Sequence, residues 1–467
     1  MLLSMRVAPS LWSRREALLP DHSGAAAPSP PQALARSRRA PDGPRPFLLT
    51  MPVYGGTLAA ARSLGRRGIP VTMAGDGVLA AARWSRYVTR WQKAPPVHEA
   101  QRFLEWLLEF GEREPGHVLY PTCDELAWLI SDRVAELEKH YRLYQPSVDV
   151  MLRLLDKKAL HQACREVGVD TPPTLFPGRA EEAARAGSEL GFPLLVKPRT
   201  QVLSTTRIKA VLVRRPEDLA ASYAGVVASS LYQPGVRAPL AGIDSPMMQA
   251  YRGDAHENIY SLAGFIDRGG RQIAARASVK ILQRPRRVGV GLCFEEAPVD
   301  LPTLEGLVRL CRATGYFGVF EAEYVRDGPR LQMIDFNPRF YGQMSFENAR
   351  ALPLAYLVWL GAAGEDDRLA RELTAAQGWR EGAGYIYTNR FFLRMMLSLQ
   401  RLTGNVPRAE AGRWRRWLSD HRRRALAVDA AHAADDRLPG LVSAAYEMYA
   451  ACRHPRYFMR QILLNRD

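Results

Sequence analysis

The sequence predicts a mixed fold, α/β at the start and α+β in the middle, followed by a helical C-terminal part. Three observations support this prediction. Apolar strand-like runs alternate with amphipathic helical runs over residues 47–147. Strand-like segments separated by turns fill much of residues 191–337, and from about residue 364 the pattern is helical with no convincing strand. Alternating strands and helices are typical of a parallel sheet covered by helices, and runs of strands are typical of α+β domains.

Composition sets the class of protein. The chain has 467 residues, of which 47% are hydrophobic and 24% are charged, which is ordinary for a globular protein. This length corresponds to about two to four domains. No apolar run reaches the ~18 residues that a membrane-spanning helix needs. The five cysteines include no CxxC pair, which excludes a disulfide scaffold and an ordinary zinc cluster and indicates a reducing cytoplasm.

The net charge of +16 is concentrated at the two ends of the chain. Residues 1–46 hold seven arginines against three acids, and residues 401–467 hold thirteen arginines against seven acids. No nucleic-acid-binding motif accompanies this charge, so we expect no nucleic-acid partner. Anionic substrates, or contact with an acidic membrane or protein surface, are the alternatives. Residues 1–46 are rich in Ala, Pro, Ser and Arg without periodicity, which predicts a disordered extension.

The first layer is predicted element by element. An apolar strand starts at Phe47 and turns at Gly55-Gly56, and Thr57 can cap a helix that Gly68 ends. A second strand over 69–75, a helix over 98–110 and a third strand over 117–121 follow, and Asp124 begins another helix. No G-x-G-x-x-G is present, so a tight strand-to-helix turn is favoured over a phosphate loop at Gly55-Gly56.

The middle of the chain reads as strands joined by turns and helices. We expect a helix over 149–167, a break at the Gly168 to Pro173 link, and a buried strand that ends in Lys197-Pro198. Further strands over 202–213 and 245–290, a helix over 304–314 and two closing strands over 318–325 and 331–337 complete this part.

Carboxylates on the two closing strands are the strongest chemical signal. Side chains alternate along a strand, so Glu321 and Glu323 share one face, as do Asp335 and Asn337. A hairpin brings one carboxylate of the first strand beside Asp335 and Asn337, which gives the hard oxygen donors that Mg²⁺ prefers when phosphates complete its coordination. Arg339 follows and can contact the same phosphates. The alternative is a solvated hairpin with ordinary surface acids.

Two lysines add to this signal. Lys197 ends an apolar strand, where an unpaired ammonium is costly unless an anion faces it. Lys157 lies on a helix before the Gly168 link, and by itself it is better explained as a solvated residue.

These residues, in this order, make the chain resemble the ATP-grasp superfamily, and within it the ligases that join a carboxylate to an amine. The ATP-binding domain of the carbamoyl phosphate synthase large subunit is an example of this type. The resemblance runs from about Phe47 to Leu360. It rests on five pieces in the family's order: Ala60 to Gly65 with Ser85-Arg86-Tyr87, Asp156-Lys157 with the Gly168 link, Val196-Lys197-Pro198, Met248 to Asp254, and Glu323-Tyr324 with Asp335 to Arg339.

The resemblance implies roles for individual residues. Lys157 and Lys197 would hold ATP phosphates, and Glu323, Asp335 and Asn337 would hold Mg²⁺, with Mn²⁺ as an alternative ion. For the nucleoside, the resemblance assigns the hinge residues Met248, Gln249 and Tyr251 to adenine and Asp254 or Glu257 to the ribose. Arg339 would stabilise the transferring γ-phosphoryl group. The acyl phosphate or the substrate carboxylate would be faced by Arg276, Lys280 or Arg284.

Three positions depart from the family's pattern. The hinge has Ala250 where the family often has Glu, the loop after Lys197 reads Thr200 to Thr206 instead of being glycine-rich, and Asp335 replaces the commoner Glu.

The resemblance also implies a domain division and a function. Residues 1–46 would be the disordered extension, 47–148 a Rossmann-like pre-ATP-grasp domain, 149–362 the two-lobed ATP-grasp domain, and 363–467 a helical basic region. The implied function is an ATP-dependent ligase that activates a small carboxylate as an acyl phosphate for attack by an amine. A thiol or hydroxyl nucleophile is a second enzymatic interpretation. The non-enzymatic alternative is a degenerate ATP-binding adaptor at a membrane.

The C-terminal region leaves two interpretations open. Arg413 to Trp417 and His421 to Arg424 are predicted to share one helix, and residues 457–464 close the chain with an apolar run. Trp and Arg together suit peripheral contact with an anionic membrane. A helix that packs its tryptophans on the body and solvates its arginines is the favoured alternative.

Overall fold

The computed structural model describes residues 43–202, 204, 208–233, 239–240, 242–251, 259–284, 290–379, 384–387, 389–420 and 426–459. Residues Arg45–Asp467 form one compact unit, separate from Met1–Pro44. The predicted disordered extension lies almost wholly outside the described residues. Within the described part, no helix is long and apolar enough to cross a membrane.

The first layer is a five-stranded parallel sheet in the order β3-β2-β1-β4-β5. Its strands are β1 (Phe47–Leu49), β2 (Val71–Gly75), β3 (Arg90–Lys93), β4 (Val118–Leu119) and β5 (Arg142–Leu143), and its helices are α1 (Gly55–Gly65), η1 (Ala81–Trp84), α2 (Ala100–Arg113), α3 (Asp124–Asp132) and α4 (Val134–Leu137). The parallel α/β layer was predicted. Strand β3 was not, because its residues are partly exposed and polar.

The Gly55-Gly56 turn has a packing role in this structure. Helix α1 already begins at Gly55, so the expected cap at Thr57 is wrong: Thr57 lies in the first turn and its hydroxyl donates to the carbonyl of Thr50 at 3.0 Å. A Cβ built on Gly56 would lie 2.3 Å from the carbonyl oxygen of Tyr341. The glycine therefore allows the start of α1 to approach the segment that follows β14.

The middle of the chain contains two antiparallel sheets. The smaller has the order β6-β9-β7-β8 and the larger the order β14-β13-β10-β11-β12-β15-β16, in which β15 and β16 pair in parallel. The smaller sheet comprises β6 (Thr174–Leu175), β7 (Leu194–Lys197), β8 (Val211–Val213) and β9 (Met247–Ala250). Helices α7 (Ala180–Leu190) and α8 (Leu219–Ser229) pack on it, with η2 (Pro216–Asp218) beside them. Helices α5 (Val148–Leu155) and α6 (Lys157–Glu166) precede this sheet in the chain and pack against each other.

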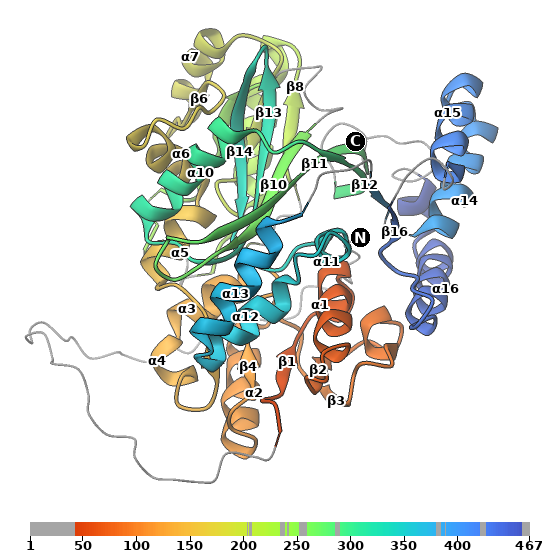
Figure 1. Ribbon diagram of the computed structural model, residues 1–467. Helices are drawn as coiled ribbons and strands as arrows, with labels where there is room; N and C mark the ends of the chain where they lie inside the picture. Colours follow the sequence, from red (N-terminus) through yellow and green to blue (C-terminus); the bar gives the residue numbers. More distant parts are fainter. Residues whose placement is uncertain are drawn as a thin grey trace, which may run out of the picture. The chain divides into compact units, whose positions relative to one another are not determined.

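The larger sheet carries the long strands (Figure 1). They are β10 (Ile259–Ile266), β11 (Ile273–Arg284), β12 (Val290–Ala297), β13 (Gly318–Asp327) and β14 (Arg330–Asn337), with β15 (Tyr385–Tyr387) and β16 (Ala427–Asp429) at one edge and helices α10 (Leu301–Thr314), α11 (Met344–Ala349), α12 (Leu354–Ala363) and α13 (Asp366–Gln377) nearby. The expectation of no strand after residue 364 is therefore wrong. Strands of three residues are too short to show periodicity in a sequence.

The C-terminal helices are α14 (Arg390–Leu402), α15 (Arg408–Ser419), α16 (Leu438–Arg453) and α17 (Pro455–Tyr457). The prediction that Arg413 to Arg424 share one helix is wrong, because α15 ends at Ser419; residues 421–425 lie outside the described part. Trp414 is buried, and Trp417 donates to Glu295 Oε1 at 2.5 Å. The favoured alternative, in which the tryptophans pack on the body, is confirmed.

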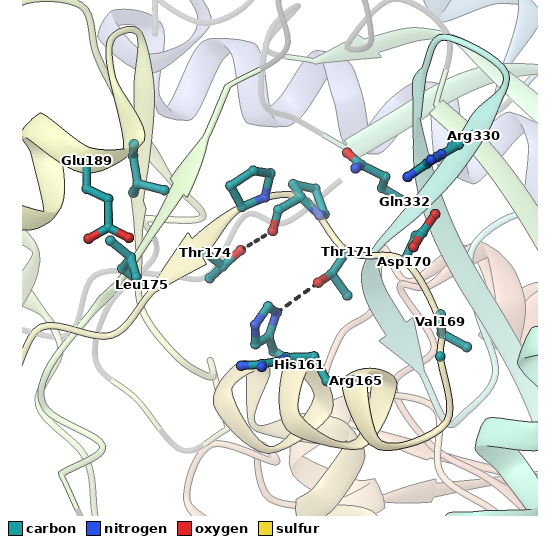
Figure 2. Close-up of a pocket in the computed structure, with 14 residues that line it drawn as sticks. His161, Arg165, Val169, Asp170, Thr171, Thr174, Leu175, Glu189, Arg330 and Gln332 are labelled. Carbon is teal, nitrogen blue, oxygen red and sulfur yellow. Dashed lines mark hydrogen bonds between the residues drawn. The ribbon is translucent and has the colours of Figure 1, made fainter.

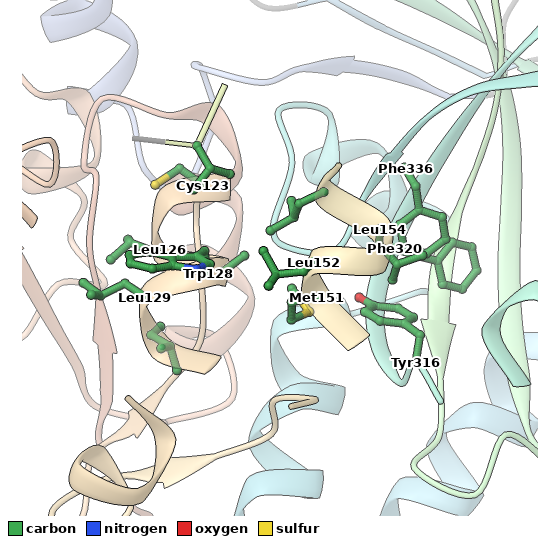
Figure 3. Close-up of a cluster of buried hydrophobic side chains, with 14 of the residues drawn as sticks. Cys123, Leu126, Trp128, Leu129, Met151, Leu152, Leu154, Tyr316, Phe320 and Phe336 are labelled. Atoms are coloured by element: carbon green, nitrogen blue, oxygen red, sulfur yellow. The ribbon is translucent and has the colours of Figure 1, made fainter. Parts of the chain in front are cut away.

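Helix α5 joins the first layer to the larger sheet. Figure 3 shows Leu126 and Leu129 of α3 beside Met151 and Leu152 of α5, with Tyr316, Phe320 and Phe336 on the far side of α5. All of these side chains are buried. Each contributes about 1.5–3 kcal/mol on full burial, so this shared core fixes the N-terminal layer against the β13–β14 hairpin.

A buried ion pair ties α1 to the segment between β16 and α16. Arg62 Nε donates to Asp436 Oδ2 at 2.9 Å, and the two side chains are 5% and 1% exposed. Ser85 Oγ and the Arg86 N–H also donate to the Asp436 carboxylate. Nearby, Arg66 pairs with Asp435, but those side chains are 43% and 41% exposed.

These two pairs make a matched test of the joint. Asp436→Asn should destabilise the chain by about 3–5 kcal/mol, because it leaves Arg62 charged and buried without a counter-ion. Asp435→Asn should cost about 0–1 kcal/mol, because its pair is exposed to water. Urea unfolding midpoints of the two variants check this, and equal midpoints would contradict the structural role of the buried pair.

Candidate functional site

The β13–β14 hairpin brings the predicted carboxylates together. Glu323 pairs with Asp335 and Glu321 pairs with Asn337 in the antiparallel register. The register of this pair shifts only between Glu323 and Tyr324. The four polar side chains therefore lie on the same side of this irregularity, in regular pairing, and share one face of the sheet. The predicted metal ligands Glu323, Asp335 and Asn337 are therefore neighbours.

Each of the two facing carboxylates has a lysine. Lys280 Nζ, from β11, lies 2.5 Å from Glu323 Oε1, and Lys157 Nζ, from the start of α6, lies 2.5 Å from Asp335 Oδ1. Burial alone would lower the pKa of both lysines, but the paired carboxylates outweigh burial and raise it. Burial would likewise raise the pKa of Asp335, and Lys157 outweighs it so that the pKa falls. Lys157, Lys280 and Asp335 are therefore charged at neutral pH.

Lys197 differs from these lysines because its described partner is an amide. Its Nζ donates to Gln249 Oε1 at 2.9 Å. Burial and the neighbouring charge of Lys157 lower the pKa of Lys197 to about 8. Lys157 and Lys280 each have a carboxylate partner, but among the described residues Lys197 has only an amide. The positive charge of these lysines therefore exceeds the negative charge of their partners, which favours binding of an anion here.

A buried pair that the sequence interpretation missed holds Lys157 in position. Asp156 caps α6 by accepting from the Lys158 N–H at 3.2 Å, and it accepts from Arg199 Nε at 2.8 Å. The Lys157 N–H donates to the Arg199 carbonyl at 2.9 Å. These contacts fix the start of α6 beside the chain that follows Lys197. The predicted single helix over 149–167 is wrong, because the chain divides there into α5 and α6 at Asp156. An Asp within a helical pattern is a capping signal that could have identified this division.

Glu321 is a second carboxylate at the site and was not chosen as a ligand from the sequence. It is buried, and it accepts from Ser261 at 3.2 Å, from Asn337 Nδ2 at 3.1 Å and from Gln343. Burial, and after it the charge of Glu323, raises the pKa of Glu321 to about 7. The sequence signal that could have identified Glu321 is its spacing of two residues from Glu323, which puts both side chains on the same face of the strand.

Arg339 connects the hairpin to the first layer. Its Nε donates to Asp124 Oδ1, at the start of α3, at 2.5 Å, and its Nη2 donates to Asn337 Oδ1 at 2.8 Å. Burial would lower the pKa of Arg339, but Asp124 outweighs it and raises the pKa. The guanidinium thus lies next to a predicted ligand. Asp124 was predicted only as a helix start.

The hinge residues lie close to Lys197 but are already engaged in the fold. The Met248 side chain is buried in the core of the smaller sheet. The N–H groups of Ala250 and Tyr251 donate to the carbonyls of Pro173 and Pro193. Gln249 bridges Lys197 and Thr174. The predicted ribose residues, Asp254 and Glu257, lie outside the described residues.

The basic residues of β11 separate into different surroundings. Lys280 joins the site, whereas Arg276 donates to the carbonyls of Arg350 and Ala376, away from the carboxylate pair. Arg284 ends β11, and its side chain lies outside the described part of the chain.

The donor set fits a hard divalent cation. Glu323 and Asp335 supply carboxylate oxygens and Asn337 an amide oxygen, on adjacent positions of two paired strands. In the described part of the chain, no group of three or more His, Cys, Asp or Glu side chains is placed to hold a metal by itself. The set therefore suits an ion that also takes phosphate oxygens, as Mg²⁺ does.

A separate hollow lies behind the link between α6 and β6. It measures about 610 Å³ and is lined by residues of α6, the Gly168 to Thr174 link, the end of α7 and the start of β14. Figure 2 shows Gln332 and Arg330 on one side and Thr174 and Leu175 on the other. The residues that line it include no predicted ligand or phosphate-binding lysine.

The chain is similar to known proteins in sequence and in fold. No family model matches the chain. It is 28% identical over 222 residues to the carbamoyl phosphate synthase large chain of Thermus thermophilus, covering 45% of this chain and 20% of that protein. It is 27% identical over 139 residues to the formate-dependent phosphoribosylglycinamide formyltransferase of Ignicoccus hospitalis, covering 28% and 33%. The matches therefore span a third or less of these relatives.

Solved structures show the same fold. The biotin carboxylase domain of the Hydrogenobacter thermophilus 2-oxoglutarate carboxylase, solved with MgADP and bicarbonate, aligns with a TM-score of 0.54 and 18% identity over 68% of this chain and 69% of that one. Biotin carboxylase of Campylobacter jejuni aligns with a TM-score of 0.54 and 16% identity over 73% and 74%. The expected resemblance to the ATP-grasp carboxylate–amine ligases is confirmed, and the chain has the mixed α/β fold of biotin carboxylase.

The raised pKa of Glu321 predicts a pH dependence of stability. Its ordinary pKa is 4.5 and its pKa in the folded chain is about 7, so between these values the folded state holds a proton that the unfolded state has lost. The free energy of unfolding should therefore fall, by about 3 kcal/mol at most, as pH rises through this window. Glu321→Gln should flatten that fall.

Urea unfolding at several pH values between 4 and 8 measures this effect. Glu305→Gln on α10 is the matched control, because Glu305 is exposed and lies outside the site. A slope that Glu321→Gln leaves unchanged would show that this carboxylate does not hold the proton.

Proposed function

We propose that the chain is an ATP-dependent ligase. It transfers the γ-phosphoryl group of ATP to a carboxylate, and an amine then displaces phosphate from the acyl phosphate to form an amide. One observation carries the proposal: lysines and metal-binding oxygen donors converge where the end of β7 and the start of α6 meet the β13–β14 hairpin. Phosphoryl transfer is catalysed mainly by positioning and by charge stabilisation, and this set supplies both.

Lys157 and Lys197 are the proposed phosphate ligands. Lys157 lies at the first position of α6, where the partial positive charge of the helix end disfavours a cation unless an anion is also present. Lys197 has a neutral partner and a lowered pKa, so it gains from a phosphate more than a paired lysine does. On nucleotide binding, the phosphates would take over Lys157 from Asp335.

Glu323, Asp335 and Asn337 would hold Mg²⁺, or Mn²⁺ as an alternative hard ion, between protein and phosphates. The ion supplies positive charge that neutralises the transferring phosphoryl group. The neighbour solved with MgADP supports a magnesium-bound nucleotide as the ligand. Arg339 is proposed to stabilise the transferring γ-phosphoryl group, and Lys280 or Arg284 to face the acyl phosphate or the substrate carboxylate. For the nucleoside, the proposed residues are Met248, Gln249 and Tyr251 at adenine and Asp254 at the ribose.

The alternative of a degenerate ATP-binding adaptor has less support. An adaptor without turnover would have no need of metal ligands. The proximity of Glu323, Asp335 and Asn337 to one another and to Lys157 and Lys280 supports the enzyme over the adaptor. The proposed domain division assigns this whole set to residues 149–362. Residence in a reducing cytoplasm is also proposed, and five free cysteines, four of them buried, support it.

The substrates are best found by a screen of carboxylates and amines for phosphate release from ATP. Phosphate release that requires one carboxylate and one amine together would support the proposal. ATP binding without release for any pair in the screen would favour the adaptor.

Asp335→Asn should reduce magnesium-dependent turnover at least a hundredfold, because the variant keeps the shape of the side chain but loses the charge that holds the ion. Asp367→Asn, on the exposed surface of α13, is the control for loss of one carboxylate. Initial rates of phosphate release measure both variants. Full activity of Asp335→Asn would remove this residue from the metal site.

Lys197→Met should weaken ATP binding by about 1.5–3 kcal/mol, the value of a hydrogen bond to a charged group. Lys158→Met is the matched control, because Lys158 lies next to Lys157 but faces the Phe176 ring. Calorimetric titration with ATP and Mg²⁺ compares the two variants. Equal ATP affinities of the two variants would show that Lys197 does not bind phosphate and has only a structural role.

A further inference from the structure

Helix α16 buries Ser443 and Glu447 against the protein, while several of its large apolar side chains are exposed. The buried residues of α16 are Pro439, Ser443, Glu447 and Ala450. Leu441 and Met448 are 65% and 56% exposed, and Leu438 and Tyr449 are each 48% exposed. This is the reverse of the usual arrangement, in which the apolar stripe of a surface helix faces the core.

The exposed residues form one continuous stripe. Leu438, Leu441, Ala445, Met448 and Cys452 are spaced by three or four residues, which places them above one another on a helix. Tyr449 lies beside Met448 on the same side. At a rise of 1.5 Å per residue, the stripe is about 20 Å long.

Specific contacts hold α16 in this orientation. Ser443 Oγ accepts from Asn389 Nδ2 at 3.2 Å, and Asn389 also caps α14 by accepting from the Phe392 N–H at 3.1 Å. At its N-terminal end, α16 follows Asp436, which the buried pair with Arg62 fixes. The outward apolar stripe is therefore part of the folded arrangement of this region, since rotating α16 would break these bonds.

The acidic residues near the start of α16 all accept hydrogen bonds from neighbouring groups. The Asp436 carboxylate pairs with Arg62 in the interior. The Asp435 side chain is 41% exposed, and it accepts from Arg66 and Tyr87. The Asp429 carboxylate accepts from the N–H groups of Arg390, Ala431 and His432. The surface next to the stripe consequently carries little uncompensated negative charge.

Exposed arginines stand at both ends of the stripe. Arg437 directly precedes α16, Arg453 ends it and Arg456 follows on α17. All three are exposed, and none forms an ion pair with another described residue. An apolar helix face bordered by cations and free of anions matches an anionic lipid surface, into which the apolar residues insert while the arginines meet the headgroups.

We propose that α16 docks the chain onto anionic membranes through Leu438, Leu441, Met448 and Tyr449, with Arg437, Arg453 and Arg456 at the headgroups. A second copy of the chain is disfavoured as the occupant. In a symmetric antiparallel contact between two α16 helices, Arg437 of each copy would approach Arg453 and Arg456 of the other, and like charges would meet. The proposal does not depend on ATP turnover.

Sedimentation of the full chain with vesicles tests the proposal. The vesicles are phosphatidylcholine alone, or phosphatidylcholine with about 30% phosphatidylglycerol. Wild type should bind the anionic vesicles at least tenfold more tightly than the neutral ones, and high salt should weaken this binding because salt screens the arginine contribution. No binding to anionic vesicles, or equal binding to both kinds, would overturn the proposal.

Matched variants locate the contact. Leu441→Ser with Met448→Ser should reduce binding to anionic vesicles at least tenfold, and Arg437→Gln with Arg453→Gln and Arg456→Gln should abolish the preference for anionic vesicles. Val78→Ser with Leu301→Ser is the control, because these side chains are 60% and 65% exposed elsewhere. Because all these side chains are exposed, thermal melting should match wild type in every variant.

Two results would refute the assignment of α16. One is equal loss of vesicle binding in the Val78/Leu301 control and the Leu441/Met448 variant. The other is a wild-type dimer in analytical ultracentrifugation that the Leu441/Met448 variant dissolves, together with no difference in vesicle binding. That second result would assign the stripe to a second copy of the chain.

Discussion

Glu323 and Asp335 stand opposite each other on β13 and β14, and their mutual repulsion is the constraint around which the site is arranged. Lys280 reaches Glu323 from the same sheet, while Lys157 reaches Asp335 from the start of α6. Lys197 then remains beside an amide, with a pKa lowered by burial and by Lys157. Under the proposed function, a metal ion would replace the lysines beside the carboxylates, and the phosphates of ATP would replace the carboxylates beside the lysines.

Contacts around the site hold its lysines and carboxylates in position. Asp156 and Arg199 fix the start of α6, and Arg339 joins the end of β14 to Asp124 of the first layer. The shared core around α5 supports both connections from behind (Figure 3). Buried pairs of this kind add little net stability compared with apolar packing, but losing one partner is costly, so they specify position.

The sequence predicts the long, regular parts well and the short or long-range parts poorly. The alternation at Glu321–Glu323 and Asp335–Asn337 is local, so it predicts one face of a hairpin, and the structure confirms that placement. The partners Lys280 with Glu323 and Arg339 with Asp124 join residues far apart in the chain, and no local pattern encodes them. Strands β15 and β16 have three residues each; β15 forms on the edge of β12, and β16 forms on the edge of β15. The orientation of α16 could not be predicted either, because a sequence pattern is interpreted on the assumption that the apolar stripe of a surface helix faces the core.

The most direct test of the proposed nucleotide site is labelling with an acyl phosphate derivative of ATP, which acylates lysines that lie beside the bound phosphates. The neutral amine is the reactive form, so Lys197, with a pKa of about 8, should react fastest at pH 8, followed by Lys157. Mass spectrometry should locate the label on these lysines, and ATP with Mg²⁺ should protect both. Labelling confined to surface lysines such as Lys139, unaffected by ATP, would contradict a nucleotide site between β7 and the β13–β14 hairpin.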